Sequence, residues 1–311
     1  MVNFPKGMKR SIKKAALFIL LTFFLSWVMA ILFFGSGGRA YTAGWLVMTV
    51  TYMFIPAAMA VVVQKFVYKE PLKQPLGISF KLNRWFFVAW LLPVAIAFAS
   101  VGISSVFPGV EFSAQPEGSR VFEHFRTLVP AERLQEMESQ TASLPVHPFW
   151  FGLLMGLIAG VTINAVAGFG EELGWRGLLQ REFGFMGFWK SSIVVGLIWG
   201  IWHAPIILHG HNYPYHPVAG IFMMTALTLL LAPIFSYVRL KSESVIAAAI
   251  IHGSFNATAG LPLVVIKGGS DLTVGVTGLA GFVVLGIVNV AILVYDRNFA
   301  KVPVTTGPNC F

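Results

Sequence analysis

Charged residues are scarce in this chain. Lys, Arg, Asp and Glu make up 11% of its 311 residues, whereas an ordinary soluble domain carries about 25%. Hydrophobic residues make up 56%, and the mean hydropathy is +0.75. A water-soluble fold has no means of hiding this much apolar surface, because its exterior needs polar groups. The composition therefore excludes a soluble globular protein and indicates an integral membrane protein.

Cysteine is almost absent as well. The single cysteine, Cys310, is next to the last residue of the sequence and excludes a disulfide within the chain. It is not the fourth residue from the end, so the tail is not itself a CaaX prenylation signal. We interpret Cys310 as an incidental residue of the tail, and the redox compartment stays open.

Acidic residues are fewer than basic ones, with 13 Asp and Glu against 22 Lys and Arg and a net charge of +9. A nucleic-acid-binding protein gathers its basic residues into one patch with interleaved aromatic side chains. Here they lie in short segments between apolar runs, where they act as topology signals. Nucleic acid is therefore excluded as a partner, and membrane lipids are expected instead.

Apolar runs of about 20 residues, the length that crosses a bilayer, recur along the chain. Eight of them are predicted spans: residues 15–34, 43–63, 85–107, 149–169, 187–206, 217–237, 245–266 and 273–295. Basic residues precede the first run, as in a signal peptide, but the run is too long for one and no clear cleavage site follows. We therefore expect a retained first helix and an all-α polytopic transmembrane bundle. No internal repeat is found, so residues 1–311 are predicted to form one domain.

Glycine and proline interrupt the fourth to seventh predicted spans. The interruptions are Gly168 and Gly170 in the fourth, Pro205 in the fifth, Pro233 in the sixth, and Gly253 and Gly260 in the seventh. Broken helices at membrane depth are tolerated only where they face protein or a wet cavity. We therefore expect irregular helices in the C-terminal half, with Gly168 and Gly170 ending the fourth span, and a functional core within about 149–266.

Loop charge predicts the orientation. With the N-terminus in the cytoplasm, the inside segments hold 17 of the 22 Lys and Arg residues and the outside segments hold five. Cytoplasmic loops carry such an excess, so both termini are predicted to be cytoplasmic. The longest loop, about 108–148, is then outside, and residues 130–140 after Pro130 read as a short amphipathic helix. A solvated cap is the simpler interpretation of this loop, and a lid or a partner-docking surface is the alternative.

Three short motifs place ionisable or polar side chains in or beside apolar helices, where they are costly and therefore candidates for function. The first is Glu171-Glu172-Leu-Gly-Trp-Arg176. On a helix, Glu172 and Arg176 are four residues apart and can form an ion pair, while Glu171 faces elsewhere. A desolvated Glu171 suits a general base. A juxtamembrane salt bridge with Glu171 in solvent is the alternative.

The second motif, Trp199-Gly-Ile-Trp-His203, lies near the end of the fifth span, and the third, His252-Gly-Ser-Phe-Asn256, lies inside the seventh. His252 and Asn256 are four residues apart and share one helix face, where both are expensive to bury without a partner. A hydrogen-bonded packing role for His203 and polar contacts between helices for the other two are the structural alternatives.

A further group of histidines, His209, His211 and His216, follows in the segment LHGHNYPYHP. Tyr213 and Tyr215 beside them are typical of a membrane interface. A solvated interfacial loop is therefore favoured over a metal site, and the loop is also placed to frame the mouth of a site at His203.

Together, the three motifs put a carboxylate, an imidazole and an imidazole–amide pair on three helices. A carboxylate and an imidazole can deprotonate water, and a second imidazole with an amide can stabilise an oxyanion, which suits hydrolysis of an acyl bond. Glu171, His203 and His252 are alternatively ligands for zinc, although the H-E-x-x-H signature of soluble zinc proteases is absent. A proton-coupled transporter is a further alternative, although transporters commonly carry internal repeats.

In this order, the motifs resemble those of the CPBP family, which comprises type II CAAX prenyl proteases and bacteriocin-processing, Abi-like intramembrane proteases. The family pattern is E-E-x-x-x-R, then an aromatic residue four positions before a histidine, then H-x-x-x-N or H-x-x-x-D, each on its own transmembrane helix. The matching residues are Glu171, Glu172, Arg176, Trp199, His203, His252 and Asn256. Phenylalanine is common where Trp199 stands. The resemblance covers about 150–260 and does not extend to the first spans.

The resemblance implies a glutamate-dependent intramembrane endopeptidase that cleaves a membrane-associated peptide or a prenylated protein. It implies that Glu171 activates the water with help from His203, that His252 and Asn256 form the oxyanion site, and that the other two residues of the first motif support its geometry. No cofactor is expected, because an amide such as Asn256 is a poor zinc ligand but a good oxyanion donor. A non-catalytic scaffold or immunity protein of the same fold is the alternative, and the oligomeric state is left open.

The predicted topology contains one conflict. Glu171 follows the fourth span on the cytoplasmic side, whereas His203 lies near the outer end of the fifth. The two side chains can meet only if a span is shifted or broken. A fourth helix that runs on through Glu171 to Gln180 would bring them closer.

Overall fold

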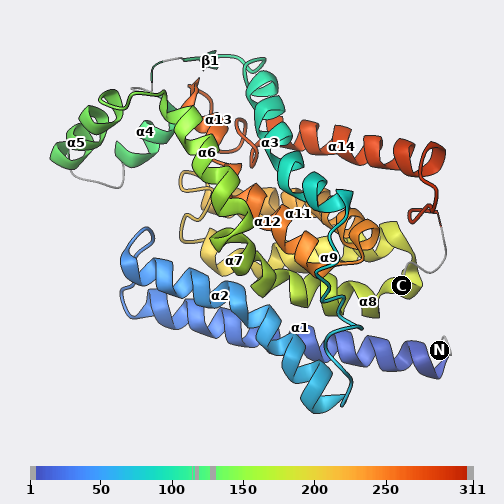
Figure 1. Ribbon diagram of the computed structural model, residues 1–311. Helices are drawn as coiled ribbons and strands as arrows, with labels where there is room; N and C mark the ends of the chain where they lie inside the picture. The colour runs from blue at the N-terminus through green and yellow to red at the C-terminus, as the bar shows by residue number, and fades with distance from the viewer. Residues whose placement is uncertain (1–4, 114, 116–118, 127–130, 307–311) are drawn as a thin grey trace.

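The fold is a bundle of helices in the computed structural model, which describes residues 5–113, 115, 119–126 and 131–306 (Figure 1). Cys310 and Pro130 lie outside the described residues. In chain order the elements are α1 (Lys6–Gly35), α2 (Ala43–Val61), η1 (Val62–Val67), α3 (Arg84–Ser104), β1 (Glu111–Phe112), α4 (Arg120–Arg126), α5 (Ala131–Ala142), α6 (Pro148–Val161), α7 (Ile163–Glu172), η2 (Leu173–Leu179), α8 (Gln180–Glu182), η3 (Gly184–Met186), α9 (Phe188–Trp202), α10 (Ala204–Ile207), α11 (Pro217–Ser242), α12 (Val245–Thr258), α13 (Leu261–Val264), β2 (Ile266–Lys267) and α14 (Leu279–Asn298).

The predicted spans correspond to helices of the bundle. Among the described residues, six helical segments are long and apolar enough to cross a membrane: α1, α2 with η1, α3, α11, α12 with α13, and α14. A seventh span is the pair of α6 with α7 to α8, which is bent by 49°, and α9 is a shorter apolar helix. The prediction of an all-α, polytopic bundle is therefore confirmed. Helix α9, which corresponds to the fifth predicted span, is shorter than a full span.

Large apolar side chains cover the outside of the bundle. Leu20 and Phe24 on α1, Phe222 on α11 and Ile287 on α14 are each at least 60% exposed. A soluble monomer rarely exposes so much apolar surface in one place, whereas a bilayer solvates it. Lipid-facing helices explain why the outside is apolar, and the polar side chains of the motifs are turned inward.

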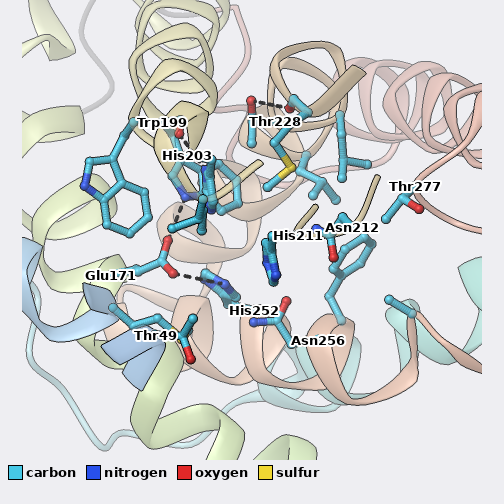
Figure 2. A pocket seen from close by; sticks show the side chains of 18 of the residues that line it. Thr49, Glu171, Trp199, His203, His211, Asn212, Thr228, His252, Asn256 and Thr277 are labelled. Atoms are coloured by element: carbon cyan, nitrogen blue, oxygen red, sulfur yellow. Dashed lines mark hydrogen bonds and ion pairs between the residues drawn. The ribbon is translucent and has the colours of Figure 1, made fainter. Parts of the chain in front are cut away.

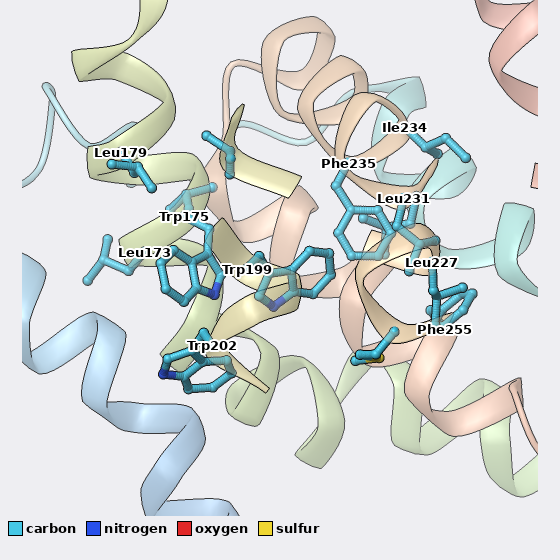
Figure 3. Close-up of a cluster of buried hydrophobic side chains, with 14 of the residues drawn as sticks. Leu173, Trp175, Leu179, Trp199, Trp202, Leu227, Leu231, Ile234, Phe235 and Phe255 are labelled. Atoms are coloured by element: carbon cyan, nitrogen blue, oxygen red, sulfur yellow. The ribbon is translucent and has the colours of Figure 1, made fainter. Parts of the chain in front are cut away.

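The centre of the bundle is built around α12. This helix packs against α3, α6, α7 and α11. Beside it, α9 packs along α11, and the aromatic rings of Trp175, Trp199, Trp202 and Phe235 meet in one buried cluster (Figure 3). Such rings bury large areas in an edge-to-face arrangement, as Trp175 and Trp202 do at 5.5 Å between ring centroids. The cluster forms the wall against which the motif residues are held.

The loops gather at the two ends of the bundle. At one end, the short strands β1 and β2 pair antiparallel, with Glu111 opposite Lys267 and Phe112 opposite Ile266. At the same end, the Tyr41 hydroxyl donates to Gly210 O at 3.1 Å, and the Tyr215 amide donates to Asp271 Oδ2 at 3.0 Å. These contacts join the four segments that loop charge assigns to the outside.

The segments that loop charge assigns to the inside meet at the other end. Glu70, in the loop after η1, accepts a hydrogen bond from Lys14 of α1, and Lys14 also contacts Glu182 of α8. Asn83 donates to Ser242 O at 3.0 Å, and Lys241 donates to Val302 O at 2.6 Å. The described loops thus alternate between the two ends of the bundle, which is consistent with about eight spans, and which end faces the cytoplasm stays a prediction.

The fourth span differs from its prediction. The helix bends at Thr162, and α7 then runs through Gly168 and Gly170 into the π-helix η2 and on to Glu182. The prediction that these glycines end the helix is wrong, because their role is close packing. A Cβ on Gly168 would meet Ala249 O at 2.9 Å, and one on Gly170 would meet Met53 O at 2.6 Å. The continuation to Gln180 considered from the sequence is what the structure has.

Three further interruptions have different outcomes. The fifth span is irregular, because α9 ends at Trp202 and the short α10 contains Pro205. The sixth is one continuous helix through Pro233, since neighbouring groups in a bundle can compensate for the hydrogen bond that proline lacks. The seventh breaks after Thr258, and Gly253 lies inside the helix.

The longest loop contains the predicted amphipathic helix. Helix α5 covers Ala131–Ala142, and Arg133 and Glu136 on it form an ion pair at 2.6 Å while each is 59% exposed. This exposure fits the interpretation of a solvated cap.

Candidate active site

Four predicted site residues line one cavity between α7, α9 and α12. Its volume is about 290 Å³, and Glu171, His203, His252 and Asn256 all border it (Figure 2). Water takes up about 30 Å³ per molecule, so the cavity has room for several waters or for part of a peptide. The three motifs, which are separated by up to 85 positions in the chain, therefore form one site.

The first motif forms the buried ion pair that the sequence predicts. Arg176 Nη1 donates to Glu172 Oε1 at 3.0 Å, and both side chains are fully buried. The guanidinium also lies over the rings of Trp199 and Phe235, at 4.5 Å and 5.1 Å from their centroids. These cation–π contacts stabilise the buried guanidinium in addition to its ion pair with Glu172. The pair sits behind the cavity wall and is not among the residues that border it.

Glu171 has a different environment from its neighbour. It is 2% exposed, and its Oε2 accepts hydrogen bonds from Trp199 Nε1 at 2.7 Å and from Trp175 Nε1 at 3.3 Å. No Lys or Arg forms an ion pair with it among the described residues. Two neutral indole donors therefore hold one carboxylate oxygen, and the group borders the cavity without a guanidinium or ammonium partner.

Trp199 has a role that the sequence analysis did not assign to it. The aromatic residue of the second motif was interpreted only as a match to the family pattern, but its indole N–H bonds the glutamate of the first motif. Its ring also lies against His203 and His252, at 5.9 Å and 5.5 Å between centroids. Trp199 thus touches a residue of every motif.

His203 reaches the depth of Glu171 because α9 is short. Its 15 residues rise about 22 Å, less than the roughly 30 Å of a hydrocarbon core. A helix of this length that begins at one membrane surface ends inside the apolar layer, and His203 is the residue that follows α9. Its Nδ1 lies 2.8 Å from Trp199 O. Together with the extended α7, this resolves the conflict between loop charge and the position of the two side chains.

His252 connects the two glutamates. Its Nδ1 lies 2.8 Å from Glu172 Oε1, and its Nε2 lies 3.9 Å from Glu171 Oε1. Asn256, one turn further along α12, borders the same cavity and is exposed to it. The prediction that these residues share one helix face is confirmed, whereas the contact with Glu172 was not predicted.

Glycines bring α12 close enough for these contacts. A Cβ on Gly253 would lie 2.4 Å from Ala165 N and 2.6 Å from Gly160 O, so the backbones of α12 and of the bent fourth span touch. Gly168 of α7 belongs to the same contact, because a Cβ there would lie 3.2 Å from His252 Cβ and 3.3 Å from Gly253 N. Small residues allow such close approach between membrane helices. The spacing between His252 and the two glutamates therefore depends on the absence of side chains at these positions.

The loop between α10 and α11 supplies further residues at the cavity. His211 and Asn212 border it, and burial lowers the pKa of His211 to about 4, so this imidazole is neutral at physiological pH. The other two histidines of the group turn away. His209 stacks on Phe34 at 3.4 Å, and His216 Nδ1 lies 2.6 Å from Asp271 Oδ1. The expectation that this loop frames the site is met by one of its three histidines.

The zinc alternative requires a set of ligating side chains around one point. Among the described residues, no group of three or more His, Cys, Asp or Glu side chains has the arrangement that holds a metal ion. Within the zinc alternative of Glu171, His203 and His252, two imidazole nitrogens are occupied by other partners, Trp199 O and Glu172.

Comparison with known proteins supports the family resemblance. Residues 145–258 match the model of a family described as type II CAAX prenyl endopeptidase Rce1-like. The resemblance inferred from the motifs is confirmed. All seven motif residues lie within this Rce1-like region.

A curated relative points in the same direction. The chain is 32% identical over 137 residues to a CAAX prenyl protease 2 of Methanococcus maripaludis. The alignment covers 41% of this chain and 46% of that protein, so the similarity spans about half the length of the relative. Helices α1 to α3 lie outside the Rce1-like region, and their part in the site rests on contacts such as that of Tyr52, whose hydroxyl donates to Trp202 O at 2.7 Å.

Proposed function

We propose that the protein is an intramembrane endopeptidase that hydrolyses a peptide bond of a membrane-associated or prenylated substrate. The observation that carries this is Glu171, a buried carboxylate that borders a cavity at membrane depth without a Lys or Arg partner among the described residues. The similarity to CAAX prenyl proteases supports the choice of substrate class. We further propose one domain over residues 1–311, with the catalytic core at about 149–266 and both termini cytoplasmic.

In the proposed mechanism, Glu171 takes a proton from a water molecule that His203 helps to orient. The Trp199 and Trp175 indoles hold Oε2, so Oε1 is the oxygen available as base. The water oxygen forms a bond to the carbonyl carbon, and the carbonyl oxygen becomes an oxyanion. Glu171 then returns the proton to the departing amine as the C–N bond breaks. General-base catalysis of this kind contributes about 10²–10⁴-fold.

The oxyanion would be met by His252 Nε2 and the Asn256 amide. Since His252 Nδ1 contacts Glu172, a donor at Nε2 requires protons on both ring nitrogens. The surrounding charges allow this. If both glutamates are ionised and Arg176 is charged, an imidazolium at His252 would make the cluster neutral.

Substitution of the base tests the proposal. Purified Glu171→Gln should cleave a farnesylated CaaX peptide about 10²–10⁴ times more slowly than wild type and keep its melting temperature. Glu132→Gln, an exposed glutamate on α5, is the matched control and should cleave at the wild-type rate. Cleavage by Glu171→Gln within a few-fold of wild type would rule out the mechanism.

Two further measurements address metal and substrate. A chelator should leave wild-type cleavage unchanged, and metal analysis should find less than one zinc per chain. Inhibition by the chelator with recovery on added zinc would instead favour the metal mechanism. Comparing the membrane proteomes of cells with wild type and with Glu171→Gln should reveal the natural substrate as a peptide that is uncut only in the variant.

A further inference from the structure

A second polar pocket lies apart from the cavity of Glu171, at the end of the bundle where α1 begins. Its volume is about 700 Å³, and it lies between the loop that follows η1, the end of α11 and the segment after α14. Lys73 and Lys81 border it from the loop, and Arg239 borders it from the last turn of α11, with Glu243 beside them. Three cations against one carboxylate leave this lining with a net positive charge.

Arg239 is the residue that indicates a ligand. Only 8% of it is exposed, its Nε is buried without a hydrogen-bond partner, and it forms no ion pair with any described residue, Glu243 included. Lys241, two positions later, shows the usual arrangement, since its Nζ contacts Asp296 Oδ1 at 3.2 Å and Val302 O at 2.6 Å. A buried guanidinium without a partner is costly unless an anion compensates it.

The neighbouring loop is shaped around this guanidinium. Gly77 has a φ of +68°, and a Cβ at this position would overlap the Arg239 side chain. The loop is fixed in place, because Gly77 O accepts a hydrogen bond from Val245 N at 2.8 Å and Ser244 Oγ donates to Ser79 O. The pocket is therefore preorganised by contacts that do not involve a ligand.

The position of the pocket selects the kind of anion. Arg239 is in the last turn of a candidate span, and the loop joins the ends of two others, which places the pocket at the level of lipid headgroups. A guanidinium matches phosphate oxygens with paired hydrogen bonds, and basic pockets between spans bind anionic headgroups. We infer that this pocket binds a phosphate group. The position of the pocket favours the headgroup of an anionic phospholipid as the source of that phosphate. Its occupation requires no peptide cleavage.

Native mass spectrometry of the full chain in detergent tests the inference. The chain is titrated with dioleoylphosphatidylglycerol and, separately, with zwitterionic dioleoylphosphatidylcholine. We expect wild type to retain one phosphatidylglycerol in preference to phosphatidylcholine. Arg239→Gln should weaken this binding about tenfold or more, because charge-assisted hydrogen bonds are lost.

Two other variants separate the pocket from general effects. Arg297→Gln removes an exposed arginine of the last turn of α14 that does not border the pocket, and it should bind within about twofold of wild type. The double variant Lys73→Gln, Lys81→Gln alters only exposed side chains, so it tests the pocket even if Arg239→Gln folds poorly. It should also weaken binding about tenfold.

A second probe, inorganic phosphate, identifies the source of the anion. A phosphate-dependent rise in the melting temperature of wild type but not of Arg239→Gln, without retained phosphatidylglycerol, would assign the pocket to free phosphate. Equal weakening by Arg239→Gln and Arg297→Gln would overturn the inference. So would the absence of both lipid preference and a phosphate-dependent shift.

Discussion

Two clusters of buried charge lie in the bundle, and their carboxylates have different kinds of partner. Near the start of α1, Lys14 is 1% exposed and contacts Glu70 at 2.6 Å and Glu182 at 3.0 Å. At the cavity, Glu171 is 2% exposed but receives only indole N–H donors and the edge of an imidazole. The first cluster joins helices, whereas the second leaves a carboxylate available for chemistry. Burial does not distinguish Glu182, which is 7% exposed, from Glu171, which is 2% exposed, whereas the identity of the partner does.

The largest expected effect on stability comes from removing the ion pair beside the cavity. Glu172→Gln leaves Arg176 buried without its carboxylate, which should lower the free energy of unfolding by about 3–5 kcal/mol. Denaturant unfolding of the purified chain measures this change. Glu171→Gln is the matched control, because it removes a carboxylate without a Lys or Arg partner among the described residues and should be close to wild type in stability. Equal stability of the two variants would remove the distinction between the adjacent glutamates.

A smaller effect is expected from the hydrogen bond that positions Glu171. Trp199→Phe keeps an aromatic ring but deletes the 2.7 Å bond from the indole, so kcat should fall about tenfold with KM nearly unchanged. Trp150→Phe, on the lipid-facing side of α6 at 54% exposure, is the control and should leave kcat unchanged. A parallel fall in melting temperature and kcat, or a change confined to KM, would show that Trp199 serves packing instead.

The smallest effect is expected at the α1 cluster. Burial alone would raise the pKa of Glu70, but the hydrogen bond and charge of Lys14, with Arg181 and Arg10, lower it below its ordinary value. A carboxyl with a lowered pKa in the folded state adds stability above its unfolded pKa of about 4.3. That contribution is lost as the pH falls through the folded pKa.

Glu70→Gln should therefore have a lower free energy of unfolding than wild type at neutral pH. The difference should be less than about 1 kcal/mol, because solvent partly screens the site. The difference should shrink below about pH 4. Glu132→Gln should show no such pH dependence. A difference that grows on acidification would contradict the assigned ion pairs.

The spans and the three motifs were predictable because they depend on local sequence. Runs of about 20 apolar residues identify spans, and residues four apart share a helix face, which gave Glu172 with Arg176 and His252 with Asn256. The end of the fourth span was not predictable in this way. Gly168 and Gly170 look like helix ends in a sequence, and only the approach of α12 and α2 shows that they are packing positions.

The contacts between the motifs were not predictable from the sequence, for a similar reason. The bond from Trp199 to Glu171 and the contact of His252 with Glu172 join residues 28 and 80 positions apart. Their geometry is set by the bend at Thr162 and by the short α9, neither of which follows from composition. The entry of His211 into the cavity likewise depends on how one loop folds back.

The glycine contact between α12 and the bent fourth span has a consequence for natural variation. Gly160, Gly168 and Gly253 are buried and carry no reactive group, yet any side chain there would push the histidine of α12 away from both glutamates. A saturation-mutagenesis map of the gene should therefore show these three positions to be as intolerant as the reactive residues themselves. By contrast, the map should show the apolar residues that line the cavity, such as Met224 and Leu227, to be more tolerant of change than these three positions.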